Sequence, residues 1–279
     1  MTAFYKMHGL GNDFVVFDAR ESRIALDEAL ARLIADRRHG VGCDQVIVIE
    51  RAKSGADVFM RIFNADGDEV ESCGNAARCV AQLLMAEKGE DCVRIETRGG
   101  PLACRDGGAG MIAVDMGQPK FGWRDIPLSR ELATDTLSVR AGGQDWIAAA
   151  VSVGNPHCVI FTDRADQIPL AELGPQIEHH QLFPARTNVE FASVIAPGRL
   201  RMRVWERGVG ITQACGTGAC ATLAAAHRRG LSPRAASVVL DGGVLDVAWR
   251  PEDDHILMTG PASLAFTGDI DLTVLENRA

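Results

Sequence analysis

Residues 60–77 read MRIFNADGDEVESCGNAA, and residues 202–219 read MRVWERGVGITQACGTGA. The two stretches align without a gap at an offset of 142 positions. That offset relates the Met-Arg pairs at their starts and also the Cys-Gly pairs that begin at Cys73 and Cys215. It is about half of the 279 residues of the chain. The match therefore predicts two copies of one supersecondary unit, each of which carries a cysteine at the same place.

Two further matches extend this duplication along the chain. Residues 11–17, GNDFVVF, resemble residues 154–161, GNPHCVIF, once one residue is inserted. Residues 45–49, QVIVI, match residues 188–192, NVEFA, at an offset of 143. Three matches in the same order at a nearly constant offset indicate a twofold pseudo-repeat. They favour two domains of roughly 100 to 150 residues each.

The sequence around each Cys-Gly pair predicts a strand followed by a buried helix. Residues 57–63 and 200–205 alternate apolar and polar side chains, which is the period of a strand. Alanine-rich segments follow the cysteines at residues 75–88 and 217–229, with basic residues in the last turn and glycine just beyond, as helices commonly end. Both segments are apolar nearly all round, so each helix is expected to be covered by its own sheet.

The rest of the chain is richer in strands than in helices. One more amphipathic helix is expected at residues 26–38. Further strands are expected at residues 93–97, 109–115, 137–139, 147–153, 237–240, 244–249, 255–259 and 262–267. A last alternating segment at residues 269–275 is expected to return as a strand and complete the first sheet. Strands that follow one another directly favour an α+β architecture.

We therefore predict an α+β fold of two pseudo-symmetric domains, each a mixed or antiparallel sheet wrapped around a central helix. The N-terminal half is expected to span residues 1–117 and to be completed by residues 263–279, and the C-terminal half to span residues 118–262. The turn at Gly117-Gln118-Pro119 is the expected linker. Because each half carries one cysteine motif, the active site is expected in the interdomain cleft.

Composition narrows the class of protein. The chain is 47% hydrophobic and 24% charged, which is ordinary for a soluble globular protein. Its formal net charge of −8 and the lack of a basic tract argue against a nucleic-acid partner. No apolar run approaches the roughly 18 residues of a membrane span, and the first residues lack the layout of a signal peptide. A cytoplasmic protein is expected, whose eight cysteines lie in a reducing compartment.

Two cysteines at helix starts can supply the catalytic groups of a racemase or epimerase. Inversion at an α-carbon needs a base on one face and an acid on the other, and one thiolate with one thiol can supply both. A helix N-terminus lowers the pKa of a cysteine from about 8.5 to roughly 3.5–7.5 in favourable cases. Its unpaired N–H groups also bind anions, such as the α-carboxylate of an amino acid, and Gly74 and Gly216 allow that anion to approach the backbone. The duplicated motif thus favours Cys73 and Cys215 as an acid/base pair.

Other uses of these cysteines have weaker support. One Cys-Gly pair before an alanine-rich helix usually indicates close packing alone, but two aligned copies reverse that interpretation. The spacings from Cys73 to Cys79 and from Cys215 to Cys220 miss the tight pairs of structural zinc sites, so no metal is expected. A Cys73–Cys215 disulfide would consume both nucleophiles. No glycine-rich nucleotide motif is complete, and none of the four lysines lies in a repeated motif to hold pyridoxal phosphate, so no cofactor is expected.

These motifs together resemble the diaminopimelate epimerase family, whose members work without pyridoxal phosphate. The resemblance rests on KMHGLGNDF at residues 6–14, NADG at 64–67, ESCGNAARC at 71–79, GNPH at 154–157, ERG at 206–208 and ACGTGAC at 214–220. It spans essentially the whole chain. One position departs from the family pattern, because Ala76 stands where the family commonly has glycine.

The resemblance implies interconversion of LL- and meso-2,6-diaminopimelate, in the biosynthesis of L-lysine and of peptidoglycan precursors. It implies Cys73 and Cys215 as the catalytic pair, each acting on one face, with His157 and Glu206 modulating their protonation. The backbone at Gly74, Asn75, Gly216 and Thr217 would hold the reacting carboxylate. The pocket would be lined by Asn12, Gln45, Asn64, Asn155, Asn188, Glu206 and Arg207. The family resemblance also implies a homodimer.

The second amino-acid head of diaminopimelate makes Arg207 the discriminating residue. A guanidinium offers a planar fork for the distal carboxylate. A proline or hydroxyproline racemase also uses paired cysteines but has no use for such an arginine. Those racemases typically have Cys-Gly-His in the first motif, where this chain has Cys73-Gly74-Asn75. A non-catalytic amino-acid binding protein would keep the pocket but would not need two helix-start thiols.

Overall fold

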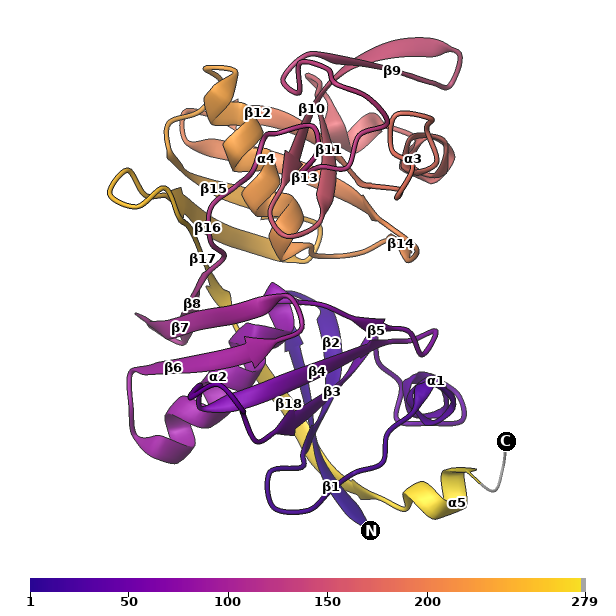
Figure 1. Ribbon diagram of the computed structural model, residues 1–279, viewed down its shortest axis with the longest axis vertical. Coiled ribbons are helices and arrows are strands. Elements are labelled where there is room, and N and C mark those ends of the chain that lie inside the picture. Colours follow the sequence, from indigo (N-terminus) through magenta and orange to yellow (C-terminus); the bar gives the residue numbers. More distant parts are fainter. Residues whose placement is uncertain (277–279) are drawn as a thin grey trace. The chain divides into compact units, whose positions relative to one another are not determined.

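The computed structural model describes residues 1–276, and the chain divides into two compact units (Figure 1). Unit 1 comprises Met1–Val114 together with the residues from Gly260 onward, and unit 2 comprises Asp115–Thr259. Strand β8 (Met111–Asp115) leads from unit 1 into unit 2, and β17 (Ile256–Pro261) leads back. Residues 277–279, the last three of the segment expected to complete the N-terminal half, lie outside the described residues.

Unit 1 is built on a mixed sheet. Besides β8, its elements are β1 (Thr2–Gly9), β2 (Asn12–Asp18), α1 (Glu28–Ala35), β3 (Gln45–Glu50), β4 (Val58–Asn64), β5 (Glu69–Val70), α2 (Gly74–Lys88), β6 (Cys92–Thr97), β7 (Gly100–Gly108), β18 (Ser263–Ile270) and α5 (Leu272–Glu276). The strand order is β18, β1, β2, β3, β4, β6, β7, with the short β5 on β4. The pairs β2–β3 and β4–β6 are parallel and the others antiparallel. The yellow strand β18 lies beside the indigo strand β1, so the end of the chain completes the sheet that its beginning starts (Figure 1).

Unit 2 repeats this plan. Besides β17, its elements are β9 (Leu137–Ala141), β10 (Gln144–Ser152), β11 (Pro156–Phe161), a short 3-10 helix (Ala165–Gln167), α3 (Leu170–Glu178), β12 (Asn188–Ala196), β13 (Arg199–Glu206), β14 (Gly210–Ile211), α4 (Gly216–Arg228), β15 (Ala235–Leu240) and β16 (Gly243–Trp249). The strand order is β9, β10, β11, β12, β13, β15, β16, β17, with β14 on β13. The pairs β11–β12 and β13–β15 are parallel, at the same places in the order as the parallel pairs of unit 1.

Strand register corrects one detail of the expected repeat. Phe17 pairs with Val48 across β2 and β3, and Ile160 pairs with Phe191 across β11 and β12. The offset is therefore 143 for all of these strands, and Phe17 corresponds to Ile160. The inserted residue expected between residues 11–17 and 154–161 is wrong, because two runs of similar apolar residues can be aligned in either register from sequence alone.

Each unit encloses one helix that begins immediately after a cysteine. Helix α2 packs on β1, β2, β6 and β7, and α4 packs on β10 to β13, β15 and β16. Alanines and other small side chains allow this close approach, and nearly every residue in the first half of both helices is buried. Helix α2 ends at Gly89, whose left-handed backbone lets its N–H bond the carbonyl oxygen of Met85. Both of these helices are predicted from sequence, and they are confirmed to within about a residue at each end. The third predicted helix, at residues 26–38, is shorter in the structure, where α1 begins after its cap Asp27 and ends before Asp36.

Two further segments differ from expectation. The alternating tail at residues 269–275 is not a strand throughout, because β18 ends at Ile270 and α5 follows. Asp271 caps this last turn, since its Oδ1 accepts hydrogen bonds from the N–H groups of Thr273 and Val274. Helix α3 has no counterpart among the predicted helices, because Gly174 and Pro175 lie within it and both disfavour helix.

Each unit has its own apolar core. In unit 1, residues of α1 pack with the buried faces of β2 and β3. In unit 2, residues of α3 pack with β9 to β12. A fully buried side chain such as Phe17 or Phe191 contributes about 1.5–3 kcal/mol to folding, so these clusters hold the strand ends that carry the polar residues. Within residues 1–276, no helix has the length and apolar character needed to cross a membrane.

Candidate active site

Cys73 is the N-cap of α2. Its backbone is extended, and its Sγ accepts a hydrogen bond from the N–H of Ala76 at 3.4 Å. The thiol therefore faces the open N–H groups of the first helical turn, where Gly74 and Asn75 are buried. Ala76 lies inside the helix and is not among the residues with positive φ, so the alanine that replaces the usual family glycine causes no backbone strain.

Polar side chains lie near the start of α2, at one end of the strands of unit 1. The parallel strands β2 and β3 begin there and β4 ends there. The side-chain amide of Gln45 donates to Oδ1 of Asn64 at 2.8 Å. The amide of Asn75 donates to Oδ1 of Asn12 at 3.0 Å. The structure thus brings four predicted pocket residues together in two hydrogen-bonded pairs beside Cys73.

A network of charged side chains fixes the position of Asn12 through hydrogen bonds. The carboxylate of Asp44 accepts from the side chain of Asn12 at 2.9 Å and from the backbone N–H of Asp13 at 3.1 Å. Asp13 in turn accepts from Lys6 at 2.5 Å and from Arg37 at 2.7 Å. Burial opposes ionisation of Asp13, but the hydrogen bonds from Arg37 and Lys6 outweigh it and lower the pKa of that carboxyl to about 2. Sequence analysis missed this support for Asn12.

Cys215 occupies the equivalent position in unit 2 as the N-cap of α4. Its Sγ accepts from the N–H of Gly218 at 3.3 Å and lies 3.5 Å from Oγ1 of Thr217. Burial, together with the charges of Glu206 and Glu190, raises the pKa of Cys215 well above its ordinary value. The hydrogen bonds from Thr217 and Gly218 lower that pKa but do not cancel the rise. The lowering expected from the helix N-terminus is therefore outweighed at this thiol.

A chain of side chains connects Cys215 to the strands beside it. Nδ2 of Asn155 donates to Oγ1 of Thr217 at 3.4 Å, and Oδ1 of Asn155 meets Nε2 of His157 at 2.8 Å. Nδ1 of His157 meets Oε1 of Glu190 at 2.6 Å. His157 and Glu190 are both fully buried. Sequence analysis missed Glu190, although a charged residue inside an otherwise apolar strand is a signal that could have found it.

The turn after β13 carries Glu206 and Arg207. Oδ1 of Asn188 accepts from the backbone N–H of Arg207 at 2.9 Å, and the guanidinium of Arg207 donates to the carbonyl oxygen of Ala185 at 3.3 Å. Oε1 of Glu206 accepts from the hydroxyl of Thr212 at 2.5 Å. These contacts gather the predicted residues of unit 2, namely Asn155, His157, Asn188, Glu206, Arg207, Cys215, Gly216 and Thr217.

A buried carboxylate that sequence analysis missed supports the same turn. Glu178, the last residue of α3, accepts from the backbone N–H of Gly208 at 3.0 Å and from the indole N–H of Trp205 at 2.7 Å. Gly174 allows α3 to lie this close, because a Cβ there would fall 2.5 Å from Cγ of Trp205. Helix α3 therefore orients the turn that presents Arg207.

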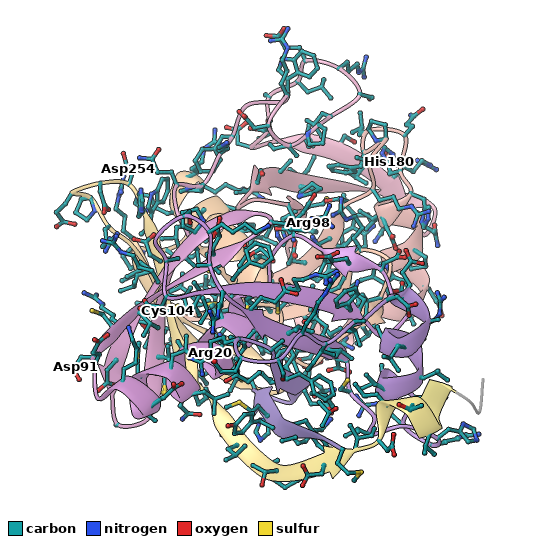
Figure 2. All side chains as sticks on the ribbon, turned by 60° about the horizontal axis from the view of Figure 1, so that its bottom comes forward. Arg20, Asp91, Arg98, Cys104, His180 and Asp254 are labelled. Atoms are coloured by element: carbon teal, nitrogen blue, oxygen red, sulfur yellow. The ribbon has the colours of Figure 1, made fainter. Side chains whose placement is uncertain are left out.

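Five other cysteines belong to the cores, and Cys220 of α4 is one of them. Burial raises the pKa of the Cys43, Cys79 and Cys104 thiols to about 12, and it also raises that of Cys158. Cys104, labelled in Figure 2, lies on β7 and faces inward with 2% of its surface exposed. Thiols with such raised pKa values are almost entirely protonated near neutral pH. They are small apolar residues of the packing.

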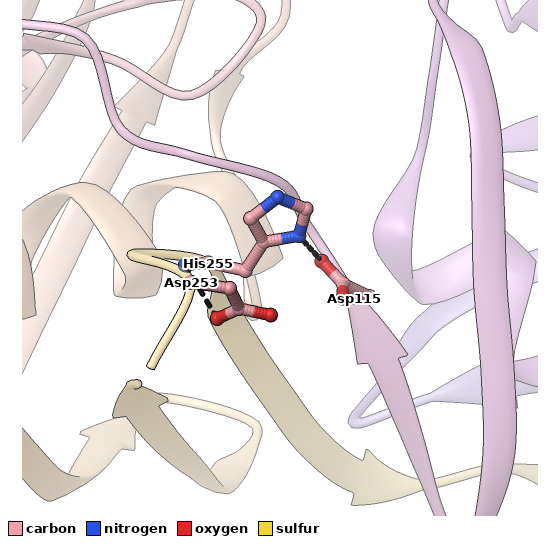
Figure 3. A group of neighbouring side chains, drawn as sticks. All are labelled: Asp115, Asp253 and His255. Carbon is pink, nitrogen blue, oxygen red and sulfur yellow. Dashed lines mark hydrogen bonds and ion pairs between the residues drawn. The ribbon is translucent and has the colours of Figure 1, made fainter. Parts of the chain in front are cut away.

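A separate cluster of ionisable groups lies where unit 2 begins and ends. Asp115 receives a hydrogen bond from Nδ1 of His255 at 2.8 Å, and Asp253 accepts from the backbone N–H of His255 at 3.1 Å (Figure 3). Arg250 bonds both carboxylates at 2.6 Å, so its guanidinium supplies the positive charge between them. The cluster ties the first residue of unit 2 to the turn that precedes β17.

Residues 4–122 and 149–265 match the family described as diaminopimelate epimerase. The chain belongs to the diaminopimelate epimerase family. A diaminopimelate epimerase from Rhodospirillum centenum is 54% identical, with 98% of this chain and 93% of the relative aligned. One from Acidiphilium cryptum is 52% identical, with 98% and 97% aligned. As a member of the diaminopimelate epimerase family, the chain is an isomerase.

Solved structures outside the diaminopimelate epimerase family share the fold. A probable proline racemase from Agrobacterium radiobacter is 18% identical, with a TM-score of 0.70 over 98% of this chain and 93% of that one. A hydroxyproline epimerase from Agrobacterium vitis is 19% identical, with a TM-score of 0.70 over 96% and 90%. At these identities the likeness shows only the fold, which is the predicted α+β arrangement of two pseudo-symmetric halves.

Proposed function

We propose that this member of the diaminopimelate epimerase family interconverts LL- and meso-2,6-diaminopimelate, with Cys73 and Cys215 as an acid/base pair. The observation that carries the proposal is that both cysteines are N-caps of equivalent helices in two sheets of the same strand order. Two equivalent thiols suit a reaction whose two directions differ in the face of the α-carbon that loses its proton. Units 1 and 2 act as the two domains of one enzyme, and each contributes one thiol to the reaction.

Each turnover moves one proton on each face of the α-carbon. One thiolate takes the α-proton, so an S–H bond forms as the C–H bond breaks, and the electron pair is delocalised into the α-carboxylate. The opposite thiol donates its proton to the other face and becomes the thiolate. The N–H groups at the starts of α2 and α4 bind the α-carboxylate, whose negative charge grows in the transition state.

The distal head of the substrate is recognised by polar side chains. Arg207 binds the distal carboxylate through its guanidinium, which suits a planar, bidentate partner. Glu206 and the side-chain oxygens of the asparagines accept hydrogen bonds from the ammonium groups. The proposal is supported by the contacts of Asn188 and Glu178 with the turn after β13, which fix the backbone that carries Arg207.

The reaction as written consumes nothing besides the substrate, so we infer that no cofactor takes part. It needs both thiols reduced, which favours the cytoplasm. Its product serves the formation of L-lysine and of peptidoglycan precursors. We further infer a homodimer, because unit 1 exposes apolar side chains close together in sequence on β18 and α5: Leu264, Phe266 and Val274 are 48%, 51% and 45% exposed.

Proton NMR of reduced protein with LL-diaminopimelate in D₂O tests the function. The α-proton signal should disappear and the meso form accumulate without added cofactor. Exchange of proline or hydroxyproline instead would identify a racemase of the alternative kind. Binding of these amino acids without any exchange would identify a binding protein.

Three alanine variants test the mechanism. Cys73→Ala and Cys215→Ala should each lower turnover by at least about 1,000-fold, since each removes one proton-transfer group. Cys92→Ala is the matched control, because Cys92 is an exposed cysteine of β6 and should retain full turnover. Full turnover by either of the first two variants would exclude the two-thiol mechanism.

A further inference from the structure

The two half-sites differ at two buried positions of otherwise matching strands. Phe14 and Ile47 of unit 1 correspond to His157 and Glu190 of unit 2, because the parallel strand pairs β2–β3 and β11–β12 have the same register at an offset of 143. All four side chains are fully buried. Unit 2 therefore carries two ionisable groups where unit 1 carries two residues of its apolar core.

Burying Glu190 at this position lowers the stability of the fold. Its Oε1 is paired with Nδ1 of His157, but its Oε2 accepts no hydrogen bond from the part of the chain that the structure describes. An ionised carboxylate inside a protein costs stability unless it is paired, and a half-satisfied one still costs some. An apolar residue suffices at the equivalent position of unit 1, so packing alone does not account for Glu190.

The carboxylate of Glu190 lies close to the thiol of Cys215. A Cβ built on Gly218 would be 2.9 Å from Oε1 of Glu190 and 3.3 Å from Sγ of Cys215. These two atoms are therefore at most 6.2 Å apart, the sum of the two distances. A like charge at about 4–6 Å disfavours ionisation of its neighbour. The glycine at position 218 makes this approach possible, since a side chain there would separate the two groups.

Glu190 also acts on the thiol through the side chains between them. It holds the ring of His157 by Nδ1, which directs Nε2 toward Asn155. Asn155 bonds Thr217, and Thr217 lies 3.5 Å from Sγ of Cys215. Because each contact fixes the orientation of the next, loss of the first partner would free the others.

We propose that Glu190 is a positioning residue of the Cys215 half-site, which orients His157 and keeps the Cys215 thiol protonated, so that the two thiols are unequal before substrate binds. This inference rests on the proposed two-thiol mechanism. The protonated thiol of unit 2 donates its proton to the carbanion. The thiol of unit 1, where Ile47 stands at the position of Glu190, acts as the base.

The surroundings of Cys215 agree with this assignment. The ionisable groups that face it are Glu190 on β12, Glu206 at the end of β13 and, through Asn155, His157 on β11. Burial and the two carboxylates raise the pKa of Cys215, while Thr217 and the N–H of Gly218 lower it. Removing the charge of Glu190 should therefore favour the thiolate.

The test is the Glu190→Gln variant, which keeps the shape of the side chain and removes its charge. The rate of iodoacetamide alkylation is measured for each cysteine separately by peptide mass spectrometry, from pH 6 to pH 10. Alkylation of Cys215 should become about tenfold faster near pH 8, the effect of a shift of about one pKa unit. Alkylation of Cys73 in the same samples should not change. A variant with native Tm and an unchanged Cys215 profile would overturn the proposal.

Glu178→Gln is the matched control, because Glu178 is the other buried glutamate of unit 2 and contacts the turn at Gly208 instead of His157. It should leave alkylation of Cys215 unchanged. In the epimerase assay, Glu190→Gln should lower kcat more than it changes KM, since Glu190 is fully buried and acts through other side chains. Equal faster alkylation in both variants would show general loosening of unit 2 and would also overturn the proposal.

A measurement on the unaltered protein covers the case in which the variant does not fold. Nitrogen-15 NMR of the histidine rings should show Nδ1 of His157 protonated from pH 6 to pH 9, because its partner is a carboxylate. An unprotonated Nδ1 in that range would contradict the orientation proposed. Neither readout depends on turnover, so full activity of Cys215→Ala would defeat the two-thiol mechanism without altering what these experiments say about Glu190.

Discussion

Asn188 joins two loops of unit 2 through its side-chain amide. Its Oδ1 accepts from the backbone N–H of Arg207 at 2.9 Å, and its Nδ2 donates to the carbonyl oxygen of Pro156 at 2.9 Å. The roles of both atoms are fixed, because one partner can only donate and the other can only accept. Asn188 therefore holds the start of β11 and the turn after β13 in one arrangement.

Replacing Asn188 by alanine should loosen the turn that carries Arg207. The buried carbonyl of Pro156 and the N–H of Arg207 would each lose a partner, at a cost of about 1–3 kcal/mol for each group. We expect KM for diaminopimelate to rise about tenfold or more, with a smaller change in kcat, measured by steady-state kinetics. Asn188→Asp keeps the acceptor for Arg207 and should lose less affinity. An alanine variant with unchanged KM would show that Asn188 does not position this turn for binding.

Replacing Gly218 by alanine should damage the Cys215 half-site. The added methyl group would lie 2.9 Å from Oε1 of Glu190 and 3.3 Å from Sγ of Cys215, so one of these groups must move. Overpacking of this kind costs about 1–3 kcal/mol of stability, and we expect kcat to fall at least about tenfold. Thermal unfolding and kinetics measure the two effects.

The reciprocal change in unit 1, Ala76→Gly, should lower stability by about 1 kcal/mol through helix propensity alone. A larger loss there would show that Ala76 has a packing role of its own.

Asp13 should make unit 1 sensitive to acid. Its pKa in the folded protein is about 2, below the ordinary value of 3.8, because Arg37 and Lys6 bond the ionised carboxylate. The ionised form is thus favoured by folding, so this stabilisation is fully present above pH 4 and is lost as the pH falls toward 2. Urea unfolding should show Asp13→Asn to be less stable by about 2 kcal/mol at pH 7, with a smaller difference at pH 3. The exposed Glu131 provides a control, since Glu131→Gln should show little difference at either pH. A difference for Asp13→Asn that stays constant with pH would contradict the assignment.

Phe266 should contribute to self-association if β18 forms part of a dimer interface. The side chain is 51% exposed on a strand that also exposes Leu264. Placing a charge on such a surface opposes burial against its own copy in an isologous interface. Light scattering after size exclusion should give a dimer for the unaltered protein and a monomer for Phe266→Glu. Ile147, an exposed apolar residue of β10, provides the control, and Ile147→Glu should stay dimeric.

Local sequence signals predict the fold well where residues near in sequence decide it. The two helices after Cys73 and Cys215 are confirmed because small residues, terminal basic residues and a following glycine all lie within one segment. Helix α3 could not be predicted in this way. Gly174 and Pro175 disfavour it locally, and the packing of Gly174 against Trp205, which comes later in the chain, compensates.

In the candidate site, too, features that residues near in sequence decide can be predicted, and those that depend on distant residues cannot. Repeated motifs identify the cysteines and the amide residues, since the duplication makes each position recognisable from its counterpart. Asp44, Glu178 and Glu190 have no such mark, because each acts by bonding a residue that folding brings near. Glu190, for example, meets His157 from the neighbouring strand, 33 positions earlier in the chain. The burial of such a pair is a property of the assembled sheet and not of either segment.

The pairing of β18 with β1 sets an order for folding during synthesis. Strand β1 is complete at residue 9, but its partner β18 begins only at residue 263. At about 5–20 residues per second, a ribosome needs roughly 13–50 s to make the chain between them. Unit 2 is one continuous segment that is made during that interval, so its first strands can pair while the sheet of unit 1 still lacks its last strand. A nascent chain stalled before residue 263 would therefore present β1 with an unpaired edge, and such an edge is where a chaperone would be expected to bind.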